Sequence, residues 1–421
     1  MATTAEVISK SRDRAIALRW IISARDDLIW LIGSVASSYL LLLLYVNGIL
    51  PLAPMVALWA ILIDAPHVFG TFSRTYFDRS ERQNRGRLLW GSLLFFAVGP
   101  LMVFAGAGLV FFFVAALWAY YHLVKQHYGF MVLYKKKNND LAPIDNALDR
   151  LLLLFAFNYP FVAFIARDPE AMARVPATLR SGVNGVASML LAGTLILAVA
   201  WLARQLQRAL TGEPLNVPKY LLLAAAIPMH WIVLLTPMPH KPIAIVAILT
   251  IYHNLQYHRL IWFHNQKYVS TGGGPGSPGG QPAWSGGSDR VTANTSTSLL
   301  ANRADDRTAT VPRERGSSPT VREGVSNELR QKYGAAELIS RRLLYYVAFG
   351  ILFGLIYQGP RQFLGYLSLK NGGATGGAAE HSFAMQLGIS FLWGYAFIHY
   401  YLDSKIWRVR RDPSVGKALN M

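Results

Sequence analysis

Residues 28–50 read LIWLIGSVASSYLLLLLYVNGIL, a run without one charged side chain. An apolar run of about 20 residues is long enough to cross the hydrocarbon core of a bilayer as an α-helix. Further segments of comparable length and apolarity raise the number of predicted spans to ten. The others are 53–72, 88–105, 107–128, 147–166, 185–206, 219–236, 242–263, 343–359 and 382–402. The sequence therefore predicts an all-α fold, a polytopic transmembrane helix bundle.

The composition agrees with a membrane protein. Hydrophobic residues make up 53% of the 421 residues and charged residues only 15%, whereas soluble domains have about a quarter charged residues. Lys and Arg are unequally divided between the segments that connect the spans, with 21 on one predicted side and six on the other. The richer side comprises 1–27, 73–87, 129–146, 204–219 and 403–421. The positive-inside rule places this side, and with it both termini, in the cytoplasm.

The net charge of +18 is thus explained by topology, and no nucleic-acid partner is expected. The basic segments are expected to lie near anionic lipid headgroups instead. We expect a multi-pass integral membrane protein of a bacterial inner (plasma) membrane.

The spans divide the chain into five regions. Residues 1–27 form a cytoplasmic segment whose pattern allows a basic amphipathic helix on the membrane surface. Residues 28–263 hold spans one to eight, and 343–402 hold spans nine and ten. Between them, 264–342 is a cytoplasmic, low-complexity insertion, predicted to be disordered over 270–325 and helical over 326–342. Residues 403–421 form a basic cytoplasmic tail.

The chain has no cysteine and ten histidines. Without thiolates, disulfides, iron–sulfur clusters and zinc fingers are excluded, and any metal must be bound by imidazole, carboxylate or backbone groups. The predicted topology puts seven histidines near the cytoplasmic ends of four spans and three near the opposite face. The seven are His67, His122, His127, His253, His258, His264 and His399; the three are His230, His240 and His381.

Carboxylates accompany these histidines. Asp64 and His67 are three residues apart, and His399 and Asp403 are four apart, so each pair lies on one helix face and can chelate one ion. Asp78 follows the second span. Ionisable groups within spans are costly, about 2.5–3.5 kcal/mol at the centre, and therefore indicate function.

Helical geometry sets a limit on two further pairs. His122 and His127, like His253 and His258, are five residues apart, which turns their side chains about 140° away from each other. Either a π-bulge brings both onto one face, or the members of each pair serve different metals or support other ligands.

The predicted metal ligands are His67, His122, His127, His253, His258, His399, Asp64 and Asp403, with His264 and Asp78 as possible additions and Gln126, Gln256 and Tyr400 as supporting residues. This number of ligands suits two ions better than one. Iron is the first choice among metals with oxygen and nitrogen ligands, and zinc or manganese stay open. Catalytic residues beyond the metal ligands are not assigned.

Two competing interpretations use fewer of these residues. In the first, the histidines are ordinary interfacial residues, because histidine and tyrosine are common at membrane interfaces and a helix C-terminus favours a cationic histidine. In the second, haem b is bound between facing helices. Such a site needs only two to four axial histidines and leaves the other histidines unexplained.

Two motifs resemble the histidine boxes of integral-membrane histidine-motif oxygenases, such as fatty-acid desaturases and hydroxylases and alkane monooxygenases. The motifs are HLVKQH at 122–127 and HNLQYH at 253–258. The resemblance implies a di-iron site, although the chain lacks adjacent histidines and has more spans than these families. Pro66-His67 and the many spans also resemble the bacterial membrane β-carotene dioxygenases, which use a few dispersed membrane histidines. Together these motifs cover about a tenth of the chain.

The expected function is that of a membrane-embedded non-haem oxygenase, hydroxylase or desaturase. Its substrate would be a lipid or isoprenoid reached from the cytoplasmic side of the bilayer, and its electrons would come from an unidentified donor. The alternative is a multi-pass transporter, or a protein that binds metal ions or protons with the same histidines.

Overall fold

The computed structural model describes residues 16–269, 327–370, 382–407, 415–416 and 419. The described residues are almost entirely helical. Their one sheet consists of two parallel strands of two residues each, β1 (Ile16–Ala17) and β2 (Leu215–Asn216). The predicted all-α, polytopic helix bundle is confirmed.

Each of the ten predicted spans corresponds to a helix or a run of consecutive helices. In chain order these are α2 (Ala24–Asp26) with η1 (Asp27–Ile32) and α3 (Val35–Val46); α4 (Leu52–Trp59) with η2 (Ala60–Asp64) and α5 (Ala65–Arg74); α6 (Arg79–Ser92) with α7 (Phe95–Phe104); α8 (Gly108–Lys137); α9 (Pro143–Arg167); α12 (Val183–Leu210); α13 (Val217–Leu235); α14 (Lys241–Asn265); α17 (Leu343–Lys370); and α18 (Phe383–Ile406). Shorter helices lie in the connections: α10 (Pro169–Ala173), α11 (Ala177–Arg180), η3 (Gln266–Tyr268) and α16 (Ala335–Ser340).

Among the described residues, eight of these ten units are both long and apolar enough to cross a membrane. The chain is therefore a multi-pass membrane protein. The other two, α14 and α18, are long enough but are not among the eight. Both lie among neighbouring helices, where polar side chains can be paired instead of facing lipid.

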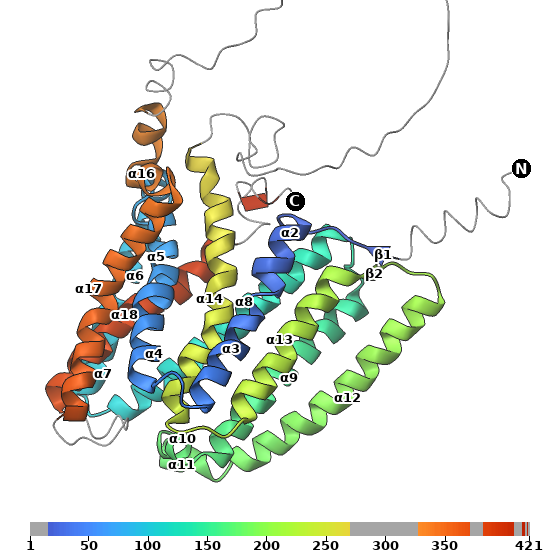
Figure 1. Cartoon of the computed structure of the whole chain (residues 1–421), viewed down its shortest axis with the longest axis horizontal. Helices are drawn as coiled ribbons and strands as arrows, with labels where there is room; N and C mark the ends of the chain where they lie inside the picture. Colours follow the sequence, from blue (N-terminus) through green and yellow to red (C-terminus); the bar gives the residue numbers. More distant parts are fainter. Residues whose placement is uncertain (1–15, 270–326, 371–381, 408–414, 417–418, 420–421) are drawn as a thin grey trace, which may run out of the picture.

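Helix α14 is at the centre of the bundle. It contacts α3, α4, α5, α8 and α13, and in Figure 1 it separates a group containing α5, α6, α7, α17 and α18 from a group containing α3, α9, α12 and α13. Helix α12 packs mainly on α9 at the outside of the second group. Residues on α14 can therefore reach both groups.

Two π-helical turns interrupt the first two crossings. The segment η2 ends at Asp64, just before Pro66 on α5. Proline has no N–H to donate to the carbonyl four residues earlier, and a wider π turn relieves that mismatch. No such turn occurs within α8 or α14, which are α-helical throughout.

The described ends of the chain lie at the same end of the bundle. Val415 and Leu419 belong to the hydrophobic cluster that contains Ile21, and in Figure 1 β1 is at the same end. An even number of crossings requires this arrangement. The interfacial helix predicted within 1–27 is absent from residues 16–23, where β1 and irregular backbone precede α2. The rest of that prediction falls on residues 1–15, and the disorder predicted over 270–325 falls on 270–326; both ranges lie outside the described residues. Residues 327–333 and α16 are helical, where a short helix was predicted.

Glycines allow close packing between α7 and α18. A Cβ atom on Gly99 would lie 2.5 Å from the backbone oxygen of Ser390, and one on Gly394 would lie 2.4 Å from the ring of Phe96. Only glycine lets the two backbones approach this closely. The packing fixes the position of α18, and with it His399.

A buried group of charges, which we call the ion network, joins α8, α13, α9 and α12. The Lys219 ammonium lies 2.7 Å from Asp140 and 3.0 Å from Asp149. Lys135 also pairs with Asp149, and Arg208 donates to Asp140 at 2.8 Å. Burial raises the pKa of Asp140, but the cations of Lys219, Lys135 and Arg208 outweigh it and hold the pKa below its usual value.

Candidate metal centre

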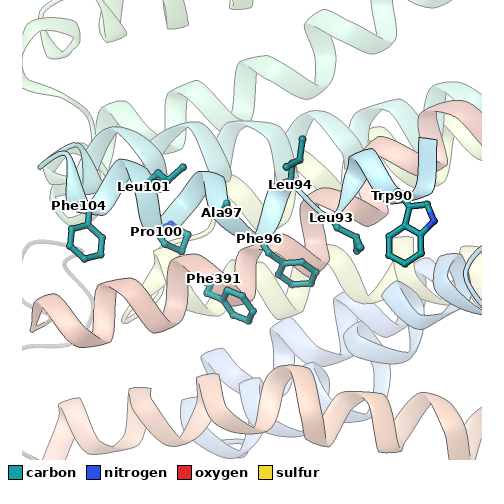
Figure 2. A pocket seen from close by; sticks show the side chains of 9 residues that line it. All are labelled: Trp90, Leu93, Leu94, Phe96, Ala97, Pro100, Leu101, Phe104 and Phe391. Atoms are coloured by element: carbon teal, nitrogen blue, oxygen red, sulfur yellow. The ribbon is translucent and has the colours of Figure 1, made fainter. Parts of the chain in front are cut away.

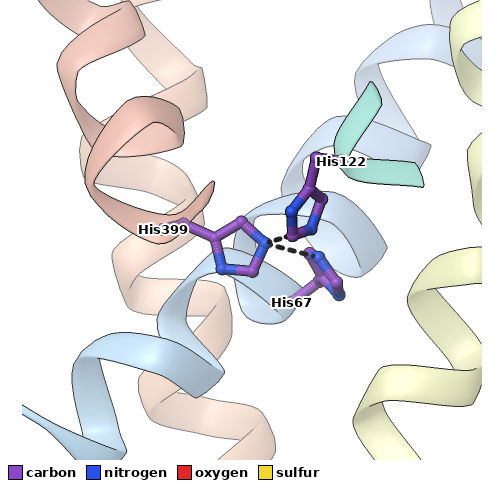
Figure 3. Close-up of side chains that lie close together, drawn as sticks. All are labelled: His67, His122 and His399. Carbon is purple, nitrogen blue, oxygen red and sulfur yellow. Dashed lines mark hydrogen bonds between the residues drawn. The ribbon is translucent and has the colours of Figure 1, made fainter. Parts of the chain in front are cut away.

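Three histidine side chains from three helices converge inside the bundle. His67 lies on α5, His122 on α8 and His399 on α18, and all three are buried. The Nε2 atom of His399 is 2.9 Å from Nε2 of His67 and 3.2 Å from Nε2 of His122. Figure 3 shows the three rings meeting between their helices. One ligand nitrogen from each ring lies within 4.8 Å of the others. These nitrogens can therefore approach one small ion together.

A fourth imidazole, that of His253 on α14, lies beside these three. Its ring centre is 4.8 Å from that of His67 and 5.2 Å from that of His122. His253 is buried, and its Nδ1 has no hydrogen-bond partner within the described part of the chain. We call His67, His122, His253 and His399 the histidine cluster. A histidine cluster supplied by four spans, as predicted, is present.

The separations of Nε2 of His399 from Nε2 of His67 and of His122 fit a metal ion. Metal–nitrogen bonds of about 2.0–2.1 Å in a tetrahedral site put neighbouring nitrogens about 3.3 Å apart. The separations of 2.9 and 3.2 Å at His399 are close to this value. Three imidazoles around one ion also leave room for a further ligand, which is the arrangement found in catalytic metal sites.

Hydrogen bonds orient the ring of His399. The Thr71 hydroxyl donates to Asp403 at 2.6 Å, and its oxygen lies 2.7 Å from Nδ1 of His399. Because that hydroxyl proton goes to Asp403, we assign the proton on Nδ1 to His399, donated to Thr71. Tyr257 also donates to Asp403, at 2.7 Å. Nε2 of His399 then carries a lone pair directed at the cluster, as a metal ligand requires.

The two predicted carboxylate ligands have other partners. Asp403 is 3.8 Å from Nδ1 of His399, on the side of the ring away from the cluster, and acts on the ring through Thr71. Asp64 accepts hydrogen bonds from Asn254 at 3.4 Å and from Gln358 at 3.2 Å. The histidine cluster is therefore built from neutral ligands, with the carboxylates outside it.

The members of each five-residue histidine pair face different surroundings, as expected for continuous α-helices. His127 turns away from His122 toward His230, with ring centres 5.4 Å apart. His258 lies 3.0 Å from the carbonyl of Ile63 and 3.2 Å from the Tyr346 hydroxyl. No π-bulge places either pair on one face, because α8 and α14 remain α-helical.

The two possible additions to the site lie away from the cluster. His264 is at the end of α14, where Nδ1 is 3.3 Å from the Asn265 side chain. Asp78 caps the start of α6 and accepts a hydrogen bond from Tyr268 at 2.9 Å. Capping explains Asp78 as a structural residue.

The predicted supporting residues lie next to the cluster. Tyr400 stacks on the ring of His122 with ring centres 4.5 Å apart. Gln126 donates to the backbone carbonyl of His253 at 2.8 Å, and Gln256 donates to the carbonyl of Leu31 at 2.7 Å. Tyr400 therefore covers one ligand, while the two glutamines hold α8, α14 and η1 together.

The cluster lies deeper in the bundle than predicted. His122 is the fifteenth of 30 residues in α8, and His253 the thirteenth of 25 in α14. A helix of 30 residues is about 45 Å long, well beyond the hydrocarbon core of about 30 Å. Because α8 continues to Lys137 instead of ending at 128, residues expected near a span end lie at mid-helix.

Three residues near the histidines were not predicted. Thr71 lies four residues after His67 and therefore on the same helix face, a spacing that the sequence does show. The sequence around Tyr257 shows no spacing that would indicate its position beside Asp403. His230 was assigned to the opposite face, but it lies on α13 beside His127, fully buried. Predicted span ends do not give the depth at which two helices meet, so the sequence does not show that His230 and His127 are neighbours.

An apolar groove lies on the surface formed by α6, α7 and α18 (Figure 2), with a volume of about 490 Å³. Its lining residues are Trp90, Leu93, Leu94, Phe96, Ala97, Pro100, Leu101, Phe104 and Phe391. Aromatic contacts connect these helices to the cluster. Phe95 on α7 contacts Trp118 (ring centres 5.6 Å apart), Trp118 contacts Tyr400 (6.1 Å), and Tyr400 stacks on His122.

Comparison of the chain with known protein families, with curated proteins and with solved structures finds no match. The functional interpretation therefore depends on the site itself.

Proposed function

We propose that this protein is a membrane-embedded, non-haem metal oxygenase that acts on an apolar lipid or isoprenoid chain. The observation that carries the proposal is the convergence of three buried Nε2 atoms, 2.9 and 3.2 Å apart at His399, with a fourth imidazole beside them. Neutral nitrogen ligands suit iron, zinc or copper better than magnesium or calcium. Iron is the metal that we propose.

One ion in the histidine cluster accounts for the geometry better than two. The remaining predicted ligands, including His127, His258 and Asp64, have partners or directions that lead away from it. One histidine from each of four helices is also nearer to the dispersed histidines of membrane β-carotene dioxygenases than to the paired boxes of desaturases. This favours an isoprenoid substrate over an acyl chain.

The residues around the cluster would each have a defined part. His67, His122 and His399 would hold the ion, His253 would line the position beside it, and Thr71 with Asp403 would keep Nε2 of His399 unprotonated. A redox metal bound there would supply dioxygen activation for attack on C–H or C=C bonds. Burial of all four rings excludes bulk water from the reacting atoms.

The apolar groove of Figure 2 supports access from the bilayer. An apolar chain would leave the lipid phase at α7 and α18 and approach Tyr400, whose ring covers His122. The unequal division of Lys and Arg supports a cytoplasmic position for the loops nearest His67 and His399, in a bacterial inner membrane. The electron donor, if the reaction needs one, would bind at that side.

Metal analysis of the purified protein tests the proposal. We expect about one iron ion per chain, lost in His253→Ala and His399→Ala. His240→Ala is the matched control, because that ring is exposed and far from the cluster. Oxygen consumption with β-carotene, compared with an oleoyl lipid, tests the substrate class. Less than one metal ion per chain, unchanged by His253→Ala, would refute the proposal, and a Soret band would indicate haem b instead.

A metal transporter is the second candidate, and the mid-helix depth of His122 and His253 favours it, since transporters bind their ions near the membrane midplane. Uptake of iron or zinc into proteoliposomes that is abolished by His122→Ala would support transport. Oxygen consumption without ion uptake would support the oxygenase.

A further inference from the structure

A second pair of histidines lies inside the bundle, outside the histidine cluster. His127 on α8 and His230 on α13 have ring centres 5.4 Å apart, with the rings nearly perpendicular at 86°. Both side chains are fully buried. Neither ring belongs to the group of converging nitrogens at His67, His122 and His399.

The hydrogen bonds of the pair determine which nitrogens are protonated. Nδ1 of His127 lies 3.0 Å from the carbonyl of Leu123, and Nδ1 of His230 lies 2.8 Å from the carbonyl of Ala226. A carbonyl accepts only, so each Nδ1 carries the proton and donates it. Each Nε2 is then a bare lone pair, and neither has a hydrogen-bond partner in the described part of the chain.

Among the residues that the structure describes, none donates a hydrogen bond to these lone pairs. Phe157 stacks on His230 with ring centres 3.9 Å apart, and Tyr252 lies 5.3 Å from His127. The hydroxyl of Tyr252 donates to the carbonyl of Leu31, and that of Tyr120 donates to the carbonyl of Phe157. Two buried acceptors without donors are destabilising, which indicates that a species able to accept electron pairs completes the site.

The ligand atoms and the charge of the aromatic surroundings of His127 and His230 determine which metal ion fits between them. Two neutral imidazoles suit copper, zinc, iron or nickel. A divalent ion would bring two positive charges into an aromatic cage in which the described contacts of His127 and His230 include no carboxylate. Cu(I) carries one charge, is soft, and accepts two nitrogen ligands in a linear arrangement.

We propose that Nε2 of His127 and Nε2 of His230 form a second metal site that binds Cu(I). Because both nitrogens are already unprotonated, Cu(I) binding releases no proton from either ring. Tyr252, whose ring centre is 5.3 Å from that of His127, directly precedes His253 on α14. The second site therefore lies behind the histidine cluster, on the side of α13.

Anaerobic titration of the chelator-treated, detergent-purified protein with Cu(I) tests the site. We expect His127→Phe and His230→Phe each to bind about one equivalent less Cu(I) than the wild type. Phenylalanine fits the aromatic cage and removes the ligand. His240→Phe, at an exposed position, is the control and should bind as the wild type does. His399→Phe should keep this equivalent, and X-ray absorption of that variant should show two nitrogen ligands on copper.

Two results would overturn the proposal. One is equal Cu(I) uptake by the wild type, His127→Phe and His230→Phe, as expected if a water molecule bridges the two Nε2 atoms. The other is loss of one equivalent of bound Cu(I) in His399→Phe but not in His230→Phe, which would place the Cu(I) in the histidine cluster. Size-exclusion profiles and helix content identify a variant that fails to fold, and the other phenylalanine variant then decides. Failure of the oxygenase proposal is read separately, from the metal lost in His253→Ala.

Discussion

The Thr71 hydroxyl oxygen lies 2.7 Å from Nδ1 of His399, on the side of the ring that faces away from the histidine cluster. The same hydroxyl donates to Asp403 at 2.6 Å. A residue with no ligand atom in the cluster thus determines which nitrogen of His399 is free to bind. Outer hydrogen bonds of this kind orient metal-binding histidines and set their tautomer.

Replacing Thr71 by valine is expected to lower the affinity of the cluster for its metal ion by about 10- to 100-fold, because His399 loses the acceptor of its Nδ1 proton. A competition titration with a metal indicator measures the affinity. Thr75→Val is the matched control, since Thr75 is also buried, at the C-cap of α5, and its hydroxyl donates to the backbone carbonyl of Thr71. Equal losses in the two variants would mean that Thr71 has only a packing role.

Removing one histidine at a time should separate cluster members from other buried histidines. His122→Ala should abolish stoichiometric binding of the cluster ion, because its Nε2 is one of the three converging nitrogens. His258→Ala should retain that ion, since His258 contacts Ile63 and Tyr346. Metal content by mass spectrometry is the measurement. Loss of the ion in His258→Ala would place His258 in the site.

Breaking the ion network should destabilise the fold. Lys219→Met removes the cation that lies within 3.0 Å of both Asp140 and Asp149, and leaves Lys135 and Arg208 as the remaining cations of the network. Removing one partner of a buried ion pair costs about 3–5 kcal/mol. Thermal unfolding in detergent, followed by helix content, should show a clearly lower Tm. Glu213→Gln, at a more exposed edge of the same network, should change the Tm little, and similar Tm values for both variants would contradict the expectation.

The pH dependence of stability follows from Asp140. Its pKa is lower in the folded protein than in the unfolded chain, where it is about 3.9. The contribution of the carboxylate is therefore fully present above the unfolded pKa, and it is lost as the pH falls through the folded pKa. The Tm of the wild type should fall on acidification below about pH 4. Asp140→Asn should show a smaller fall; an identical pH profile would exclude Asp140 as the cause.

The close approach of α7 and α18 is tested at glycine. Gly99→Ala places a Cβ 2.5 Å from the backbone of Ser390, and overpacking of this kind costs about 1–3 kcal/mol. Gly91→Ala is the comparison, because a Cβ there meets nothing within 4 Å and should be neutral or slightly stabilising. Measured Tm values should differ in this order. Weaker metal binding in Gly99→Ala would show that this packing also positions His399.

Much of the fold can be predicted from the sequence because the signal is local. A membrane-spanning helix satisfies its backbone hydrogen bonds within one segment, so an apolar run such as 28–50 specifies both its structure and its environment. All ten predicted segments are helical. The length and apolar pattern of the sequence also predict α14 and α18, which are not among the eight units long and apolar enough to cross a membrane. The residue types of the site were also predictable, since the absence of cysteine leaves imidazole and carboxylate as ligands.

The tertiary structure alone decided which histidines share a site. The sequence shows that His122 and His127 diverge by about 140° on a helix, but not which of them faces α5 and α18. That choice depends on the rotation and depth of α8 against its neighbours, set by contacts such as Phe111 on α8 with Gly99 on α7. Packing between other helices distant in the sequence brings His230 to His127 and Thr71 to His399. Apolar periodicity determines that a helix forms and crosses the membrane, whereas packing between helices determines which of its side chains meet.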